Sequence, residues 1–191
     1  MYDFLRFFPE NLPDLGFKGY VFLTEKGCGV VVRASTPREL REKLKNVRED
    51  VIVAVEAKNP EVCREAVMRK KVDIILDSVE RELDYATIKL AAEKDVAIEL
   101  GLSKFLKTRG ALRVKLFEQL MDEIFVIKKF RAPFIISSAA ENFWELRSRK
   151  QIENFFSFFG CNVKDARSYA ERLVRRYYDP NYIMDGFEVL E

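Results

Sequence analysis

Carboxylate side chains lie at the positions where this chain could do chemistry. Glu56, Asp77 and Glu99 each fall at or near the end of a short apolar run, and Asp3 lies close to the first residue. Converging carboxylate oxygens could bind Mg²⁺, which takes oxygen ligands in proteins. Their spacing matches no metal-ligand motif, and the other interpretation is that each caps a helix, pairs with a base or faces solvent. A carboxylate–metal enzyme, such as a phosphoesterase or an aldolase-like lyase, is therefore the alternative hypothesis.

The absence of histidine restricts the remaining chemistry. With no imidazole among 191 residues, neither a Ser-His-Asp or Cys-His nucleophile nor a His-ligated zinc site can form. Cys28, Cys63 and Cys161 form no CxxC pair, so a zinc-ribbon or redox motif is also excluded. We interpret them as free thiols in a reducing cytoplasm. Cys28, which has no histidine to activate it, is interpreted as a thiol beside a turn.

Positive charge is concentrated between residues 102 and 150. The net charge of the whole chain is only +2, but this part holds 11 Lys and Arg residues against 5 Asp and Glu residues. Such a local excess is compatible with an anionic partner. A solvated surface and, for Lys128 and Lys129, favourable charge at a helix C-terminus are the alternatives. We predict phosphate contacts by part of this set, whose members would share a rim if the loops converge: Lys104, Lys107, Arg109, Arg113, Lys115, Lys128, Lys129, Arg131, Arg147, Arg149 and Lys150.

Alternating strand and helix patterns must position these side chains. Apolar, largely β-branched runs predict strands at 17–23, 29–35, 51–57, 72–78, 96–102 and 134–140. Capping signals predict helices that begin after Thr36, Asn59, Ser148 and Asn162. Gly160 is expected to end the helix that Ser148 opens.

Repeated strand–helix units of this kind predict an α/β fold with a parallel sheet. No GxGxxG follows the first predicted strand and no GxxxxGK[ST] occurs, so the nucleotide-binding fingerprints are missing. Even strand spacing favours a compact or slightly incomplete (β/α) TIM-type barrel over a doubly wound sheet, although 191 residues are few against the ~250 usual for that barrel. We expect one domain over residues 1–191 with a C-terminal tail from about 178 to 191. With neither a signal peptide nor a run near the ~20 apolar residues of a membrane span, it should be soluble and cytoplasmic.

An ordered series of short motifs resembles one protein family. The motifs are Leu15-Gly16-Phe17, Val72-Asp73-Ile74-Ile75, Ile98-Glu99-Leu100 before Ser103-Lys104, Pro133 with residues 135–140, Glu145-Leu146-Arg147-Ser148, and the last helix after Gly160. Together they resemble archaeal ribonuclease P protein component 3, a relative of the eukaryotic thirty-kilodalton subunit, over nearly the whole chain. Two positions depart from the family pattern, because Ala139 replaces a glycine and Arg149 replaces a frequent proline.

The resemblance implies a barrel akin to the PHP phosphoesterases that works as a subunit of a ribonucleoprotein. That particle removes the 5′ leader from precursor tRNA, its RNA is the catalyst, and the RNA uses the Mg²⁺, so the protein itself needs no cofactor. The implied partners are ribonuclease P RNA, precursor tRNA, the ferredoxin-like protein component 2 and other ribonuclease P proteins, with no membrane. The PHP metal site is built largely from histidines, so their absence here agrees with a non-catalytic role. The resemblance also implies that the basic set binds RNA. A barrel that binds only proteins is a third hypothesis.

Overall fold

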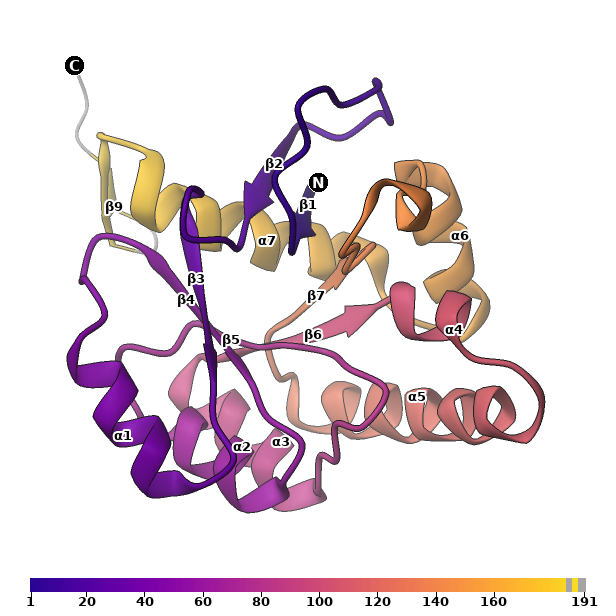
Figure 1. The fold of residues 1–191 in the computed structure, drawn as a ribbon, viewed down its shortest axis with the longest axis horizontal. Coiled ribbons are helices and arrows are strands. Elements are labelled where there is room, and N and C mark those ends of the chain that lie inside the picture. The colour runs from indigo at the N-terminus through magenta and orange to yellow at the C-terminus, as the bar shows by residue number, and fades with distance from the viewer. Residues whose placement is uncertain (185–186, 189–191) are drawn as a thin grey trace.

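A sheet of parallel strands with helices packed on its outer face makes up the body of the protein (Figure 1). The structure, a computed structural model, describes residues 1–184, 187 and 188. The strands are β1 (Tyr2–Leu5), β2 (Gly19–Phe22), β3 (Gly29–Arg33), β4 (Ile52–Glu56), β5 (Ile74–Ile75), β6 (Ala97–Gly101), β7 (Phe134–Ser137), β8 (Tyr182–Met184) and β9 (Phe187–Glu188). The helices are α1 (Pro37–Lys45), α2 (Pro60–Val67), α3 (Tyr85–Lys94), α4 (Ser103–Lys107), α5 (Gly110–Phe130), α6 (Arg149–Phe158) and α7 (Val163–Tyr178), with the 3₁₀ turn η1 (Phe143–Glu145).

The sheet is an incomplete barrel. Strands β3, β4, β5, β6 and β7 follow one another in space and are all parallel, and β1 and β2 form a separate parallel pair. The pair lies between the two edges of the larger sheet, because Leu23 forms a β-bridge with Gly29 on one side. On the other side, the Arg6 N–H donates to the Ala140 carbonyl at 2.8 Å. The predicted α/β fold with a parallel sheet is confirmed. On each side of the β1–β2 pair, these contacts take the place of the complete hydrogen-bonded ladder that would close the barrel.

The local signals for helix starts are confirmed. Thr36, Asn59, Ser148 and Asn162 each cap a helix by accepting a hydrogen bond from a backbone N–H of the first turn. Strand β1 was not among the predicted strands, because a four-residue run interrupted by a carboxylate carries almost no strand signal. The predicted strand at 72–78 is reduced to the two residues of β5 in the ladder.

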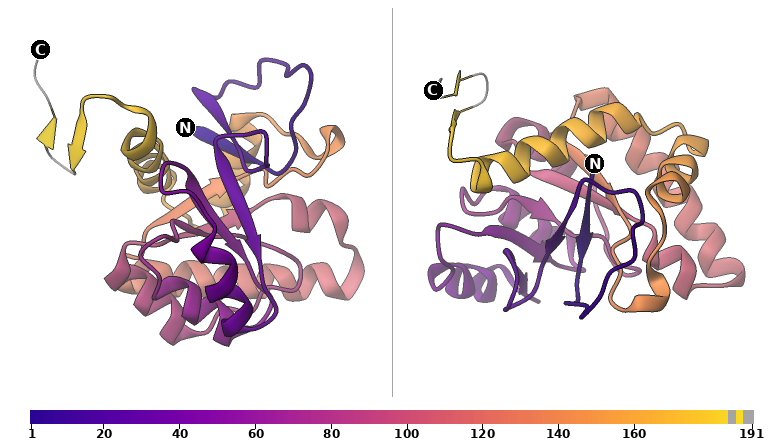
Figure 2. Two further views of the ribbon diagram at one scale, coloured as in Figure 1. Left: turned by 60° about the vertical axis from the view of Figure 1, so that its left-hand side comes forward. Right: turned by 90° about the horizontal axis from the view of Figure 1, so that it is seen from above.

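Helix α7 covers the amino-terminal end of the strands. Its residues Ala170, Leu173 and Val174 belong to one buried cluster with inward-facing side chains of β1, β2, β4, β5, β6 and β7. The Tyr177 hydroxyl donates to Asp73, just before β5, at 2.7 Å, and Arg172 and Arg176 both pair with the exposed Asp95, just before β6. Figure 2 shows α7 crossing beside β1 and the N-terminus. This helix therefore closes the end of the barrel where the strands begin.

Beyond α7 the chain forms the short antiparallel hairpin β8–β9. The expected C-terminal tail, 178–191, is thus described up to residue 184 and at 187 and 188, and its other residues lie outside the described part of the chain. Within the described residues, none of the helices combines the length and the apolar character needed to cross a membrane.

Asp3 joins β1 to the end of β7. Its carboxylate is fully buried and accepts from the Ser138 N–H and the Ser138 hydroxyl, both at 2.7 Å, and from the Phe4 N–H at 3.0 Å. Burial raises the pKa of Asp3 to about 7, although the Ser138 hydrogen bonds favour the ionised form. The junction between the two strands therefore contains a carboxyl group that titrates near neutrality.

Because folded Asp3 keeps its proton up to about pH 7 and the unfolded chain releases it near pH 4, we expect its contribution to stability to be full only below about pH 4. It should fall as the pH rises to about 7 and then stay constant. The measurement is the free energy of unfolding from pH 4 to 8 for the wild type and for Asp3→Asn. The difference between them should change across this window, and a difference independent of pH would contradict the assignment.

Ala139 adopts a backbone conformation that favours glycine. Its φ is 50°, in the left-handed region, two residues after the end of β7, and it replaces the glycine of the family pattern. A left-handed conformation costs an alanine about 1–2 kcal/mol, so Ala139→Gly is expected to raise the free energy of unfolding by up to about 1 kcal/mol after the greater entropy of glycine in the unfolded chain is allowed for. Denaturant unfolding measures this change. Ala140→Gly, at a buried position without positive φ, is the control and should destabilise.

Candidate functional site

Two of the predicted carboxylates meet at the carboxyl ends of β5 and β6. The Asp77 N–H donates to Glu99 Oε2 at 2.8 Å, and both side chains are almost completely buried. Glu99 Oε2 also accepts from the Arg6 guanidinium at 2.6 Å, and Glu99 Oε1 accepts from the Ser137 hydroxyl at 2.6 Å. Both oxygens of Glu99 are therefore already hydrogen-bonded to the protein.

Two further cations surround Asp77. Lys104 Nζ lies 2.9 Å from one of its oxygens, and the Arg81 guanidinium lies 3.2 Å from the other. The Gly101 N–H also donates to Asp77 at 2.8 Å, and Arg81 reaches Glu123 of α5 at 2.7 Å. Burial works against ionisation of Asp77, but the charges of Arg81 and Lys104 outweigh it and hold the pKa of this carboxyl below its usual value.

We call Arg6, Asp77, Arg81, Glu99, Lys104 and Glu123 the buried charge network. It contains three carboxylates and three cations, so its charge is balanced without a metal ion. A divalent cation could bind Asp77 or Glu99 only by displacing one of the paired side chains, which would leave a buried charge without a partner. No group of three or more His, Cys, Asp or Glu residues suited to a metal occurs in residues 1–184, 187 and 188.

The other two predicted carboxylates do not join this network. Glu56 pairs with Arg33 at 2.8 Å near the surface, and Asp3 hydrogen-bonds to Ser138. The set Glu56, Asp77 and Glu99 is thus not brought together. The alternative of a carboxylate–metal enzyme has no ligand set among the described residues.

Sequence reasoning missed most of the cations that complete the network. Arg6 follows the unpredicted β1, and the pairing of Arg81 with Glu123 joins residues 42 positions apart. A cavity of about 50 Å³ lies above the network, lined partly by Arg6, Ser78 and Lys107. Arg6 Nε and the Ser78 hydroxyl are buried without a protein partner, which fits a space of the size that ordered water fills.

The predicted basic set is divided between the two ends of the barrel. Helix α5 begins just after the carboxyl end of β6 and ends just before β7, and its 21 residues span about 31 Å at 1.5 Å per residue. Arg109 and Arg113 lie at its start, whereas Lys128, Lys129 and Arg131 lie at its end. The structure therefore does not bring the whole set to one rim, and phosphate contact by part of it stays a prediction.

Individual members of the set differ in how free they are. Lys104 is buried on Asp77, so it cannot contact a phosphate in this structure. Six others have protein contacts: Lys107 with Glu141 and Glu145, Arg113 with the Thr108 carbonyl, Lys129 over the Tyr85 ring, Arg147 with the Trp144 and Leu146 carbonyls, Arg149 with Glu153, and Lys128 beside Gly160. Arg109, Lys115, Arg131 and Lys150 are exposed, with no ion pair within 4.0 Å among the described residues.

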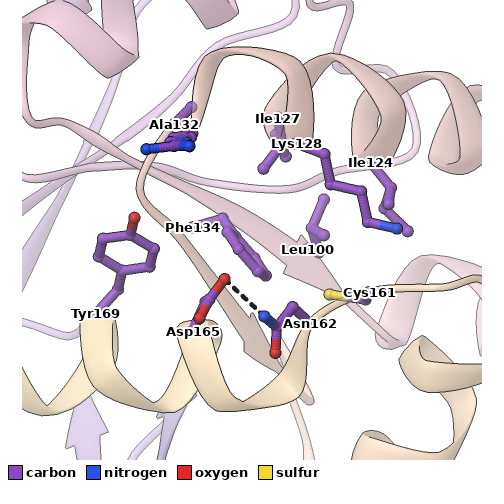
Figure 3. A pocket seen from close by; sticks show the side chains of 11 residues that line it. Leu100, Ile124, Ile127, Lys128, Ala132, Phe134, Cys161, Asn162, Asp165 and Tyr169 are labelled. Carbon is purple, nitrogen blue, oxygen red and sulfur yellow. Dashed lines mark hydrogen bonds between the residues drawn. The ribbon is translucent and has the colours of Figure 1, made fainter.

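Lys128 and Arg131 border a cavity between α5 and α7 (Figure 3). Its volume is about 390 Å³, and side chains such as Leu100, Ile127 and Phe134 form an apolar floor. Asp165 on the opposite side accepts a hydrogen bond from the Asn162 amide at 2.8 Å. Burial raises the pKa of Cys161, which also lines the cavity, to about 12, so this thiol is not a nucleophile at neutral pH.

Comparisons with known proteins agree with this geometry. The family model described as RNase P subunit p30 matches residues 27–178. The chain is 67% identical to ribonuclease P protein component 3 of Archaeoglobus fulgidus, over 99% of this chain and 96% of that protein. It is 25% identical to the protein of the same name from Methanococcoides burtonii, over 83% and 69% of the two chains.

A solved structure shares the fold. A chain in a cryo-EM structure of archaeal ribonuclease P with mature tRNA superposes with a TM-score of 0.83, covering 100% of this chain and 98% of that chain at 22% sequence identity. The family match covers most of the chain, and the 67% identity to the Archaeoglobus protein extends over 99% of it. The chain therefore belongs to the RNase P subunit p30 family, the protein subunits of ribonuclease P, as the sequence motifs implied.

Proposed function

We propose that this chain supports the RNA of ribonuclease P without supplying catalytic groups, in the removal of the 5′ leader from precursor tRNA. The observation that carries the proposal is the 67% identity to a ribonuclease P protein over nearly the full length of both chains. The buried charge network supports it, because Asp77 and Glu99 already bind protein cations and are not free to act as acid, base or metal ligand. In this proposal the RNA uses the Mg²⁺, and the protein has no cofactor.

The proposed RNA contacts are the accessible members of the basic set. Guanidinium forks suit phosphate oxygens, and such contacts position RNA without recognising its sequence. Lys104 is left out, because Asp77 holds it in the interior. Near the carboxyl end of the strands, the proposed residues are Lys107, Arg109, Arg113, Lys115, Arg147, Arg149 and Lys150. Near the amino end, they are Lys128, Lys129 and Arg131.

The proposed protein partners are the ferredoxin-like component 2 and other ribonuclease P proteins. The aromatic face of α6, a candidate for this contact, is mostly internal: Phe155 and Phe159 pack against Phe117 of α5. Phe158 is 84% exposed and is available to a partner. The role would be carried out in the cytoplasm, where precursor tRNA is made.

Substitution within the network tests the non-catalytic role. Asp77→Asn leaves Arg81 and Lys104 without a full counter-charge, so we expect it to lower the free energy of unfolding by about 3–5 kcal/mol. Precursor-tRNA cleavage by the reconstituted particle, measured with and without the chain, should depend on the chain. At temperatures where the variant stays folded, Asp77→Asn should leave that cleavage unchanged.

The matched control is Asp77→Asn combined with Lys104→Met, which removes one charge of each sign and should recover part of the lost stability. Cleavage of precursor tRNA by RNA-free protein, abolished by Asp77→Asn without loss of folding, would show that the network is catalytic.

Salt dependence tests the RNA contacts. Replacing an exposed contact, as in Arg109→Ala, should weaken binding to ribonuclease P RNA about equally for unrelated RNA sequences. It should also reduce the slope of log affinity against log salt by about 1. Arg175→Ala is the comparison, because Arg175 of α7 pairs with Asp179, just after that helix, at 3.0 Å, and it should have a smaller effect. An unchanged slope for Arg109→Ala and for Lys128→Ala would place the RNA elsewhere.

A further inference from the structure

A second group of cations gathers in a shallow groove between α1 and α2. The groove has a volume of about 410 Å³. Apart from Leu44, every residue that lines it is a lysine or an arginine: Arg41 and Lys45 from α1, and Arg69, Lys70 and Lys71 from the turn after α2. Because residues 1–101 contain more acidic than basic residues overall, charge counting along the sequence gives no sign of this groove.

One carboxylate holds the two arginines side by side. Glu65 pairs with Arg41 of the neighbouring helix at 3.6 Å and with Arg69 one turn further along the chain. Its side chain is only 19% exposed, whereas those of Arg41 and Arg69 are 49% and 42% exposed. Glu65 therefore lies below the two guanidinium groups and fixes them while leaving part of each accessible from outside.

The remaining cations have at most one weak ion pair among the described residues. Lys71 pairs at 3.6 Å with Glu49, but the Glu49 side chain is 88% exposed, and exposed ion pairs of this kind are weak. Lys45 and Lys70 form no ion pair within 4.0 Å among the described residues, and both are exposed. Five cations thus face one embedded carboxylate and one loosely held one, and the groove has a net positive charge.

Helix-end stabilisation accounts for only part of this arrangement. Lys45 lies in the last turn of α1, where a cation interacts favourably with the helix dipole. Arg69, Lys70 and Lys71 follow the C-cap residue Met68 of α2, so they lie beyond the helix. Bringing like charges together has an electrostatic cost in the free protein, and a bound polyanion would offset it.

We propose that this groove binds the phosphate backbone of RNA, as a contact surface separate from that of residues 102–150. The proposal rests on the proposed function, since RNA is the polyanion that a ribonuclease P subunit meets. Glu65 fixes Arg41 and Arg69 through part of each guanidinium group, which leaves their other N–H groups to donate to phosphate oxygens. Lys45 and Lys70 add charge from the two sides. In each strand–helix unit the helix ends where the next strand begins, so the groove lies at the same end of the barrel as Lys128 and Arg131.

The experiment measures binding of the full chain to ribonuclease P RNA over a salt series. The variant Lys45→Ala/Lys70→Ala removes the two cations that have no carboxylate partner, so it should leave the folded state intact. Loss of two phosphate contacts should lower the salt slope by about 1.5. Lys26→Ala/Lys164→Ala is the matched control, because it removes the same charge at exposed lysines outside the groove. Lys45→Arg/Lys70→Arg should retain the wild-type slope.

The outcomes separate this proposal from the proposed function. If Lys45→Ala/Lys70→Ala behaves like its control while Arg109→Ala lowers the slope, the groove does not bind RNA and the contacts of residues 102–150 stand. If the groove variant lowers the slope and Arg109→Ala does not, the groove is the RNA surface. A groove variant that loses only a protein partner, with RNA binding unchanged, would overturn the proposal. A wild-type chain without affinity for RNA would also overturn it. The role of the chain in the particle is tested separately, by reconstitution.

Discussion

The balance of buried charge around Asp77 and Glu99 is the constraint on which the rest of this structure depends. Their carboxylates connect β5 and β6 to Arg6 after β1, to Lys104 of α4 and, through Arg81, to Glu123 of α5. Removing one member of such a buried pair costs about 3–5 kcal/mol, although an apolar replacement of the whole pair is often neutral. The network therefore fixes how these elements fit together more than it adds stability. The same pairing leaves neither carboxylate free for chemistry.

The opposite end of the barrel is closed by a helix instead of by charge. The buried face of α7 covers the starts of the strands, and the Tyr177–Asp73 hydrogen bond and the Asp95 ion pairs fix its position. At the carboxyl end, where barrel enzymes have their active sites, the network leaves a cavity of only about 50 Å³. At the amino end, the cavity of about 390 Å³ lies between α5 and α7. The exposed cations of the basic set lie on outer helices and loops, where the proposed function places the RNA contacts.

Local patterns predict much of this fold, and long-range pairing explains what they miss. Caps such as Thr36 and Ser148 depend on residues three positions away, so they are visible in the sequence. Buried strands such as β4 are visible through their nearly continuous apolar runs. The partners of the carboxylates are not visible, because Arg6 is 93 residues from Glu99. For the same reason Lys104 could be assigned to the basic surface, although the fold buries it on Asp77.

Net charge counted along the sequence also does not show which cations the fold brings together. A window average treats residues 1–101 as slightly acidic, yet α1 and α2 bring together cations that lie more than twenty residues apart in sequence. At physiological salt, exposed charges interact over roughly 8 Å, so an RNA phosphate responds to the cations of one groove and not to the net charge of +2. Helix α5 has a similar consequence, because Arg109 and Lys128 are about 28 Å apart along it at 1.5 Å per residue. In the proposed function, cations held at well-separated places on the barrel contact different phosphates of one RNA, and such contacts would restrict the orientation of the RNA as well as its position.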